Sequence, residues 1–346
     1  MTSSLAKALG ATLSDRDRDK VTAQVSRYLL KPTTSTRGVD RIHPSSLASE
    51  HWCPRSAYYG MSGETVGPSE RSMVMEVVFE TGHQAHNKWQ TWLWEMGLLK
   101  GVWGCLSCLH EWEAQSPRVC PKCSATRRLL EYREVPAESE QYLIKGRSDG
   151  DVDGFGLIEI KTIGVGTIRW DAPHLLERHS YRHIDEAGAV HTGIDMDSLW
   201  KNIRVPFPAH IRQGMLYCFC TGKKQITFIY EPKFITAAPK EFTVQFRQDM
   251  VDGMLEECLV VKRALEKGRP PKRPMWAETK HRTCAQCAFK GVCWNGRAER
   301  DSGPDGALGG AEPGSKAGPP PGEPAPPQKA KVRFAPTPYG VDSPGR

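Results

Sequence analysis

The sequence lacks any apolar stretch of about eighteen residues, the length that a helix needs to cross a membrane. Its first twenty residues contain neither a continuous apolar core nor a clear cleavage site, so we expect no secretory signal. No internal repeat is evident. These absences predict a protein of the cytoplasm that has no membrane partner.

A strong charge of one sign is also missing. The chain has 47 basic and 40 acidic residues, which gives a formal net charge of +7. Residues 301–346 hold five of each sign, so the basic excess lies in the first 300 residues. This moderate balance is compatible with a polyanionic partner but does not define one.

Eleven cysteines are present. Without an export signal, clustered cysteines predict metal ligands rather than disulfides. One cluster consists of two C-x-x-C pairs separated by eleven residues, namely Cys105, Cys108, Cys120 and Cys123. This spacing predicts a zinc ribbon with four thiolates on a structural Zn²⁺. The neighbouring Trp103, His110 and Trp112 are either its small core or a contact for nucleic acid or another partner.

A second cysteine cluster is incomplete. Its members are Cys284, Cys287 and Cys293, which leave a four-thiolate site one ligand short. The candidates for the fourth ligand are Cys53, Cys218, Cys220 and Cys258. Cys218 and Cys220 lie in an apolar helical stretch and are expected to be buried structural residues. The spacing alone leaves zinc and an iron–sulfur cluster both open.

The chain divides into regions of different composition. We expect a polar extension over 1–42, a main domain over 43–300 that contains an inserted module at 101–128, and a disordered Pro/Gly-rich tail over 301–346. Helices are predicted over 44–61 (capped by Ser45 or Ser46), 70–99, 207–222 and 242–265, and strands over 129–161 and 225–230. Residues 162–206 are expected to form helix and loop.

The most informative stretch is GRSDGDVDGFGLIEIK, residues 146–161. In a strand, Glu159 and Lys161 project to one face while Ile160 faces the opposite layer. If Asp149 ends a neighbouring strand, two carboxylates and one ammonium meet at one point, which suits Mg²⁺ or Mn²⁺. The alternative is an exposed hairpin turn with solvated acids, in which Asp151 or Asp153 could also take the place of Asp149.

Taken together, the motifs resemble the PD-(D/E)XK nucleases of the RecB/AddB type, and most of all the Cas-four exonucleases of CRISPR adaptation and their phage relatives. The resemblance covers roughly residues 43–296. The matching positions, in chain order, are Cys53-Pro54-Arg55, the G-x-x-x-H pair Gly82 and His86, the G-x-x-D pair Gly146 and Asp149, Glu159-Ile160-Lys161, the Q-x-x-x-Y pair Gln213 and Tyr217, and Cys284, Cys287, Phe289 and Cys293.

The resemblance implies an α/β fold with a restriction-endonuclease-like core, in which helices flank a mixed central sheet. It implies that Asp149, Glu159, the Ile160 carbonyl and His86 hold Mg²⁺ or Mn²⁺, and that Lys161 positions water or stabilises charge. Gln213 and Tyr217 are then expected to contact DNA or Lys161. The resemblance also implies a structural 4Fe–4S cluster on Cys53, Cys284, Cys287 and Cys293, which clamps a helical region.

The implied activity is a deoxyribonuclease, an exonuclease on single-stranded DNA or DNA ends with 5′-to-3′ polarity, serving recombination, repair or CRISPR adaptation together with proteins of those pathways. Two alternatives remain: a structure-specific endonuclease that uses the same site, and a non-catalytic zinc-ribbon subunit of a replication or recombination complex. The zinc ribbon, the 162–206 segment and the tail depart from the minimal family pattern. The sequence leaves oligomerisation open.

Overall fold

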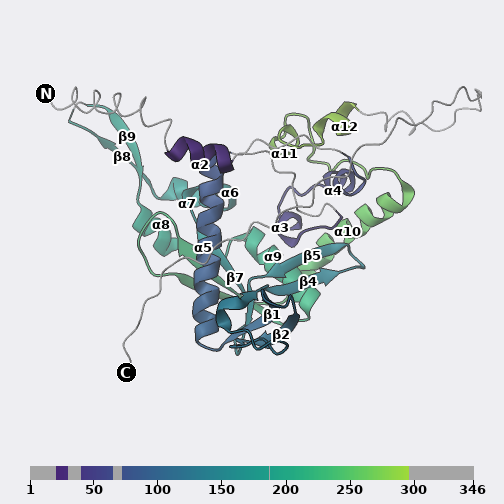
Figure 1. Cartoon of the computed structure of the whole chain (residues 1–346). Helices are drawn as coiled ribbons and strands as arrows, with labels where there is room; N and C mark the ends of the chain where they lie inside the picture. Colours follow the sequence, from purple (N-terminus) through teal and green to yellow (C-terminus); the bar gives the residue numbers. More distant parts are fainter. Residues whose placement is uncertain (1–20, 30–39, 65–71, 187, 296–346) are drawn as a thin grey trace, which may run out of the picture. The chain divides into compact units, whose positions relative to one another are not determined.

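A computed structural model describes residues 21–29, 40–64, 72–186 and 188–295 of the chain (Figure 1). Most of the predicted N-terminal extension and the whole of the predicted C-terminal tail lie outside the described residues. Within the described ranges, no helix combines the length and the apolar character needed to cross a membrane.

The centre of the fold is a seven-stranded sheet. Its order along the main path is β11 (Lys240–Gln245), β10 (Gln225–Pro232), β7 (Gly156–Ile163), β6 (Gly150–Val152), β1 (Leu99–Cys105) and β2 (Glu111–Gln115), and β3 (Leu130–Tyr132) also pairs with β1. Strands β7 and β10 run parallel, whereas the other pairs are antiparallel. The predicted mixed central sheet is therefore confirmed.

Helices cover both faces of this sheet. On one face, Trp89 and Leu93 of α5 (Met73–Glu95) pack against Ile158 and Ile160 of β7. On the other face, Leu157 of β7 joins the large cluster that contains much of α9 (Pro208–Thr221) and α10 (Asp249–Lys267). The alternation predicted for β7 is thus correct, because Ile160 packs under α5 while Glu159 and Lys161 face α9.

Two predicted helices differ from the structure. The 44–61 region contains α3 (Pro44–Leu47) and α4 (Pro54–Met61), and His43 rather than a serine precedes the first of them. Proline disfavours helical geometry in the residue before it, so Cys53 is extended and separates the two helices. The 242–265 prediction is wrong at its start, because Phe242 lies in β11 and pairs with Phe228.

The 162–206 segment contains more structure than predicted. It forms α6 (Val165–Asp171), α7 (Pro173–Arg178), the hairpin β8 (Ser180–Ile184) and β9 (Val190–Ile194), and α8 (Met196–Asn202). All five residues of β8 are exposed, so the hairpin buries no alternating apolar face that a sequence pattern could reveal.

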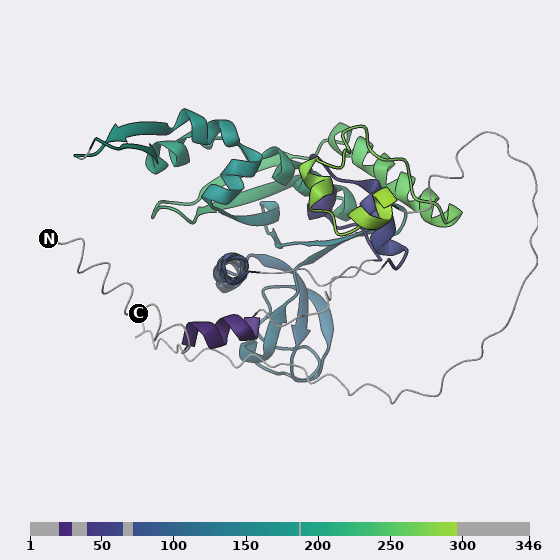
Figure 2. The same ribbon diagram turned by 90° about the horizontal axis from the view of Figure 1, so that it is seen from above.

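The remaining elements are short. They are the hairpin β4 (Val135–Ser139) and β5 (Ile144–Ser148), the 3-10 turn η1 (Arg127–Leu129), and the helices α2 (Val21–Leu29), α11 (Arg282–Ala285) and α12 (Lys290–Asn295). Figure 2, which views α5 end-on, shows the β1–β2 region beside that helix.

Candidate active site and cysteine clusters

Asp149 lies where the chain changes pairing partners. Ser148 ends β5, and Gly150 begins β6 and pairs with Ile158 of β7. Ser148 Oγ donates to the Ile158 carbonyl at 2.8 Å, and Gln90 of α5 donates to the Asp149 carbonyl at 2.9 Å. These bonds hold the Asp149 backbone between the sheet and α5, so its 5%-exposed side chain turns toward β7.

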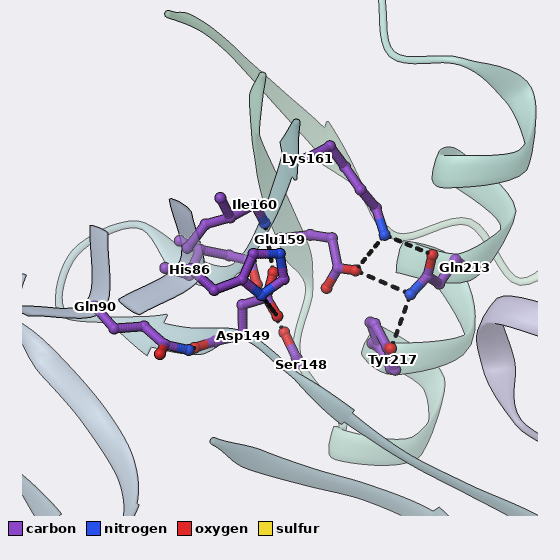
Figure 3. Close-up of polar contacts among 10 residues, drawn as sticks. His86, Gln90, Ser148, Asp149, Glu159, Ile160, Lys161, Gln213 and Tyr217 are labelled. Atoms are coloured by element: carbon purple, nitrogen blue, oxygen red, sulfur yellow. Dashed lines mark hydrogen bonds and ion pairs between the residues drawn. The ribbon is translucent and has the colours of Figure 1, made fainter. Parts of the chain in front are cut away.

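The Asp149 carboxylate occupies the edge of β7 just beyond the β6 pairing. Its Oδ2 accepts from the Ile160 N–H at 2.6 Å, and its Oδ1 lies 3.1 Å from His86 Nδ1 (Figure 3). In an extended strand, the N–H and the carbonyl of one residue face the same neighbour. The Ile160 carbonyl therefore faces the side of β7 on which Asp149 lies, as the resemblance implies.

Glu159, Lys161, Gln213 and Tyr217 form one hydrogen-bonded network on the α9 side of β7 (Figure 3). Lys161 Nζ donates to Glu159 Oε1 at 2.7 Å and to Gln213 Oε1 at 3.0 Å. Gln213 Nε2 donates to Glu159 Oε1 and to the Tyr217 hydroxyl, both at 2.9 Å. The predicted contact of Gln213 with Lys161 is present, and Tyr217 reaches Lys161 through Gln213.

The second oxygen of Glu159, Oε2, has no hydrogen-bond partner although the residue is only 3% exposed. A buried carboxylate oxygen without a donor is rare. Burial removes its hydrogen bonds with water, and this costs free energy unless a protein donor or a cation takes their place. A divalent cation bound here would supply the missing positive charge, and carboxylate and carbonyl oxygens suit Mg²⁺ or Mn²⁺. The unpaired oxygen is compatible with such an ion, but Glu159 does not belong to the described group whose ligand atoms lie within 4.8 Å of one another, which consists of His86, Glu134 and Asp149.

The two histidines at the centre of α5 differ. His86 is half-buried and contacts Asp149, whereas the His83 side chain is 74% exposed and lies 3.9 Å from Glu80. The G-x-x-x-H match thus identifies the histidine that faces the site.

Sequence reasoning missed Glu134. Its carboxylate, His86 and Asp149 present ligand atoms that all lie within 4.8 Å of one another. Glu134 sits in the link between β3 and β4 with φ at +62°, a conformation that tends to mark a local constraint in a non-glycine residue. Only this backbone placement brings it to the site, because no strand or helix spacing relates it to Asp149.

Burial and like charge perturb the titration of the site. Burial and the nearby Asp149 carboxylate raise the pKa of Glu159 to about 7 against the opposing effect of Lys161. Burial and Asp149 likewise raise the pKa of Glu134 to about 7. For Lys161 burial acts to lower the pKa, but the Glu159 and Asp149 charges outweigh it and the pKa rises. Carboxyl groups with strongly raised pKa values are typical of functional sites.

Asp151 and Asp153 do not belong to this cluster. Asp151 pairs with Lys223 at 2.6 Å, and Asp153 pairs with Lys100 at 2.6 Å. Asp149 is therefore the aspartate that meets Glu159 and Lys161.

The four cysteines of the predicted ribbon come together, with all four sulfurs within 4.8 Å of one another. The Cys105 and Cys123 sulfurs are 3.6 Å apart, and those of Cys108 and Cys120 are 3.7 Å apart. Four sulfurs bound tetrahedrally at about 2.3 Å from Zn²⁺ are about 3.8 Å apart. The observed spacing fits a single tetrahedral ion. Since β1 enters the central sheet through β6, the ribbon is an outgrowth of that sheet.

The ribbon aromatics are mostly core. Trp103 is fully buried, and its indole ring lies 4.6 Å from that of Trp94. Trp112 packs against the cluster formed by Cys105, Cys120 and Leu130. Of the two readings left open for these rings, the structure thus favours a small core.

The second cysteine set lines one cavity of about 570 Å³ between α4 and the α11–α12 region, and its members are Cys53, Cys284, Cys287 and Cys293. Among the described residues, these sulfurs do not gather as closely as those of the ribbon. A 4Fe–4S cluster carries each thiolate on a different iron and therefore needs a wider cage than one zinc ion. Cys218 and Cys258 are buried in the main core instead, as predicted for Cys218, whereas Cys220, also expected to be buried, is only half-buried at the edge of that core. The four cysteines that the resemblance assigns to a cluster therefore line one cavity, although they lie far apart in the sequence.

Comparisons with known structures find similarity to an alkaline exonuclease, LHK-Exo, from Laribacter hongkongensis, with 13% identity, a TM-score of 0.37, and coverage of 67% of this chain and 90% of that one. The same enzyme in complex with dAMP matches at 12% identity with the same TM-score. SSO0001 matches at 12% identity and a TM-score of 0.31, over 77% of this chain and 90% of that one. No protein-family model and no curated protein matches the chain.

Proposed function

We propose that the protein is a divalent-metal-dependent nuclease that hydrolyses DNA phosphodiester bonds at the Asp149–Glu159–Lys161 site. The observation that carries this proposal is Glu159 Oε2, a buried carboxylate oxygen without a donor, beside Asp149 and within the network that holds Lys161. A structural salt bridge alone leaves no reason for that oxygen to be desolvated and unpaired.

Asp149, Glu159, the Ile160 carbonyl and His86 are the groups that would hold Mg²⁺ or Mn²⁺. Such an ion supplies a Lewis acid for the phosphate and lowers the pKa of a bound water. Glu134 adds a further carboxylate beside His86 and Asp149.

Lys161 has the remaining chemical role. Glu159 and Gln213 fix its ammonium group, and the side chain remains 22% exposed. It can therefore orient a water or stabilise the negative charge that develops on the phosphate. Gln213 and Tyr217 act through Lys161 and Glu159 as positioning residues, because Gln213 bonds to both of those side chains and Tyr217 bonds to Gln213.

We further propose exonuclease action with 5′-to-3′ polarity, in recombination, repair or CRISPR adaptation, on the basis of the motif resemblance. The test compares end-labelled linear DNA with covalently closed circular DNA in the presence of Mn²⁺. Degradation of the linear DNA alone supports an exonuclease, whereas cutting of the circle reveals the endonuclease alternative. If a Lys161→Ala variant degrades either DNA as fast as the unmodified protein, the catalytic assignment is wrong.

The two cysteine sites are proposed to be structural: Zn²⁺ in the ribbon and a 4Fe–4S cluster in the cavity that joins α4 to the C-terminal helices. Anaerobic purification followed by iron, sulfide and zinc analysis tests both. One zinc and four irons per chain, with iron lost in a Cys287→Ser variant but not in a Cys220→Ser control, is the expected result. Zinc alone together with a colourless protein contradicts the cluster.

A further inference from the structure

The second knuckle of the ribbon has an unusual charge. Residues 117–128 contain four basic side chains and no acidic one, namely Arg118, Lys122, Arg127 and Arg128. A zinc ion with four thiolates carries two negative charges, which leaves this segment with a positive excess. Arg118, Lys122 and Arg128 are exposed. Concentrated charge of one sign on an exposed loop favours a partner of the opposite sign.

The knuckle is fixed to the helix that carries His86. Trp94 Nε1 donates to the Pro117 carbonyl at 2.8 Å, and the Arg127 guanidinium lies 4.4 Å above the Trp94 ring. Arg127 also pairs with Glu95 at 3.1 Å. Arg127 therefore anchors the ribbon to α5. Arg118 adds a second tie, because its guanidinium donates to the Glu95 carbonyl at 3.2 Å while the residue stays exposed. Lys122 and Arg128 present charge without such a tie, and Arg118 presents it from a fixed position.

A row of α5 side chains leads from the site to this knuckle. Gln90 and Trp94 follow His86 at four-residue spacing, so the three lie one above another on the helix. Eight residues of helix span about 12 Å, which corresponds to about four nucleotides at 3.4 Å along one strand. Figure 1 shows α5 running from the level of β7 to that of β1 and β2. A nucleic acid held at His86 and running along α5 therefore reaches the knuckle within half a helical turn.

We propose that the exposed basic side chains of the second knuckle, Arg118, Lys122 and Arg128, bind the phosphate backbone of the DNA substrate about four nucleotides from the scissile bond. The inference rests on the proposed nuclease function. Phosphate contacts of this kind fix register without reading sequence, since Lys and Arg meet a backbone that is the same at every base. The ribbon then makes the enzyme prefer DNA that extends beyond the site.

A protein partner is the competing occupant of the ribbon surface. Leu106 and Leu109 of the first knuckle are 53% and 70% exposed, and Leu109 holds a φ of +58°. The basic knuckle is favoured as the functional surface because hydrogen bonds and an ion pair join it to Trp94 and Glu95, at the end of the α5 row that contains His86. The two surfaces give different results in the experiment below.

The test replaces the three exposed basic residues in the full-length chain, Arg118→Gln, Lys122→Gln and Arg128→Gln. A matched control replaces two arginines and one lysine at the end of α10 and in the turn after it, Arg263→Gln, Lys267→Gln and Arg269→Gln, all exposed. Both variants lose three positive charges. Zinc content per chain, equal to that of the parent protein, verifies that the ribbon still folds.

DNA binding is measured in a Lys161→Ala background, which keeps the DNA uncut, as a function of salt concentration. Loss of three phosphate contacts is expected to lower the slope of log K against log salt by about 3 on duplex DNA or about 2 on a single strand, and to weaken binding by about tenfold to a hundredfold at 0.15 M salt. The control triple is expected to keep the parent slope. If the two triples give the same slope and affinity, the proposal is overturned and the exposed leucines become the candidate contact.

Cleavage separates this inference from the proposed function. Hydrolysis of the p-nitrophenyl ester of thymidine 5′-monophosphate, which is too short to reach the knuckle, is expected to be unchanged by the ribbon substitutions when Lys161 is intact. The KM for a DNA of twenty nucleotides is expected to rise at least tenfold. A parent protein that hydrolyses neither substrate refutes the nuclease; a parent that cleaves both while the ribbon variant keeps the parent KM refutes only the role of the ribbon.

Discussion

A Glu159→Gln substitution is expected to stabilise the metal-free protein while it abolishes activity. The Gln side chain has the same shape, and its Oε1 can still accept from Lys161 and Gln213. Its amide nitrogen takes the place of Oε2, the oxygen that has no donor in the native site. The change therefore replaces a desolvated negative charge beside Asp149 with a neutral hydrogen-bond donor.

The size of the effect follows from the pKa of Glu159. Burial and Asp149 raise this pKa from 4.5 to about 7, which corresponds to about 3 kcal/mol for holding the carboxylate ionised. Because the folded-state pKa is raised, the favourable contribution is complete below pH 4.5 and is lost as pH rises through about 7. Above that pH the Gln variant is expected to be more stable by up to about 3 kcal/mol, or roughly 6 °C in Tm, because the raised pKa already includes the pairing with Lys161.

The assay is thermal unfolding in EDTA at several pH values between 5 and 8, repeated with Mn²⁺. The advantage of Glu159→Gln is expected to grow with pH in EDTA. Mn²⁺ at a hundredfold excess over its Kd is expected to stabilise the parent protein by about 2.7 kcal/mol and the variant by much less. A Glu138→Gln change on exposed β4 is the control and should shift neither curve. If the Glu159→Gln protein is less stable than the parent at pH 8 in EDTA, the inference that burial of the ionised Glu159 carboxylate destabilises the metal-free protein is wrong.

Further expectations concern single side chains. Lys161→Ala should lower kcat on DNA by at least about a hundredfold, the range for loss of one transition-state donor, with KM little changed in steady-state assays. Gln213→Ala frees Lys161 from one of its two fixed contacts and should lower kcat by about tenfold in steady-state assays. Cys120→Ser should remove the zinc, measured by metal analysis, and lower the unfolding temperature, whereas the half-buried Cys220→Ser should retain the metal.

Much of the site could be predicted because its signal is local. Glu159 and Lys161 share a face through the two-residue period of a strand, and Gln213 and Tyr217 share a face through the four-residue spacing of a helix. The ribbon was similarly predictable, since each C-x-x-C turn aims two sulfurs at one point. In each case the chemistry is encoded within a few residues of chain.

Glu134 could not be found in this way. It approaches His86 and Asp149 from a connection between strands, and its position depends on a left-handed backbone conformation rather than on any period. The strand β11 was predicted as helix for a related reason. Phe242 and Phe246 are four residues apart, which is also the spacing of side chains on one face of a helix. Pairing with β10 decides the conformation there, and that pairing is a long-range interaction.

The sequence by itself determined the candidates for the chemistry: Glu159 and Lys161 on one strand face, an aspartate of the preceding turn, and two clusters of cysteines with metal-ligand spacing. Side-chain type and short spacing are sufficient for that. Only the tertiary structure decided which groups meet. It placed Asp149 rather than Asp151 against Ile160, left Glu159 Oε2 buried without a donor, and tied the basic knuckle to the helix of His86. These outcomes depend on contacts between segments far apart in the chain, where packing and desolvation act, and no local pattern records them.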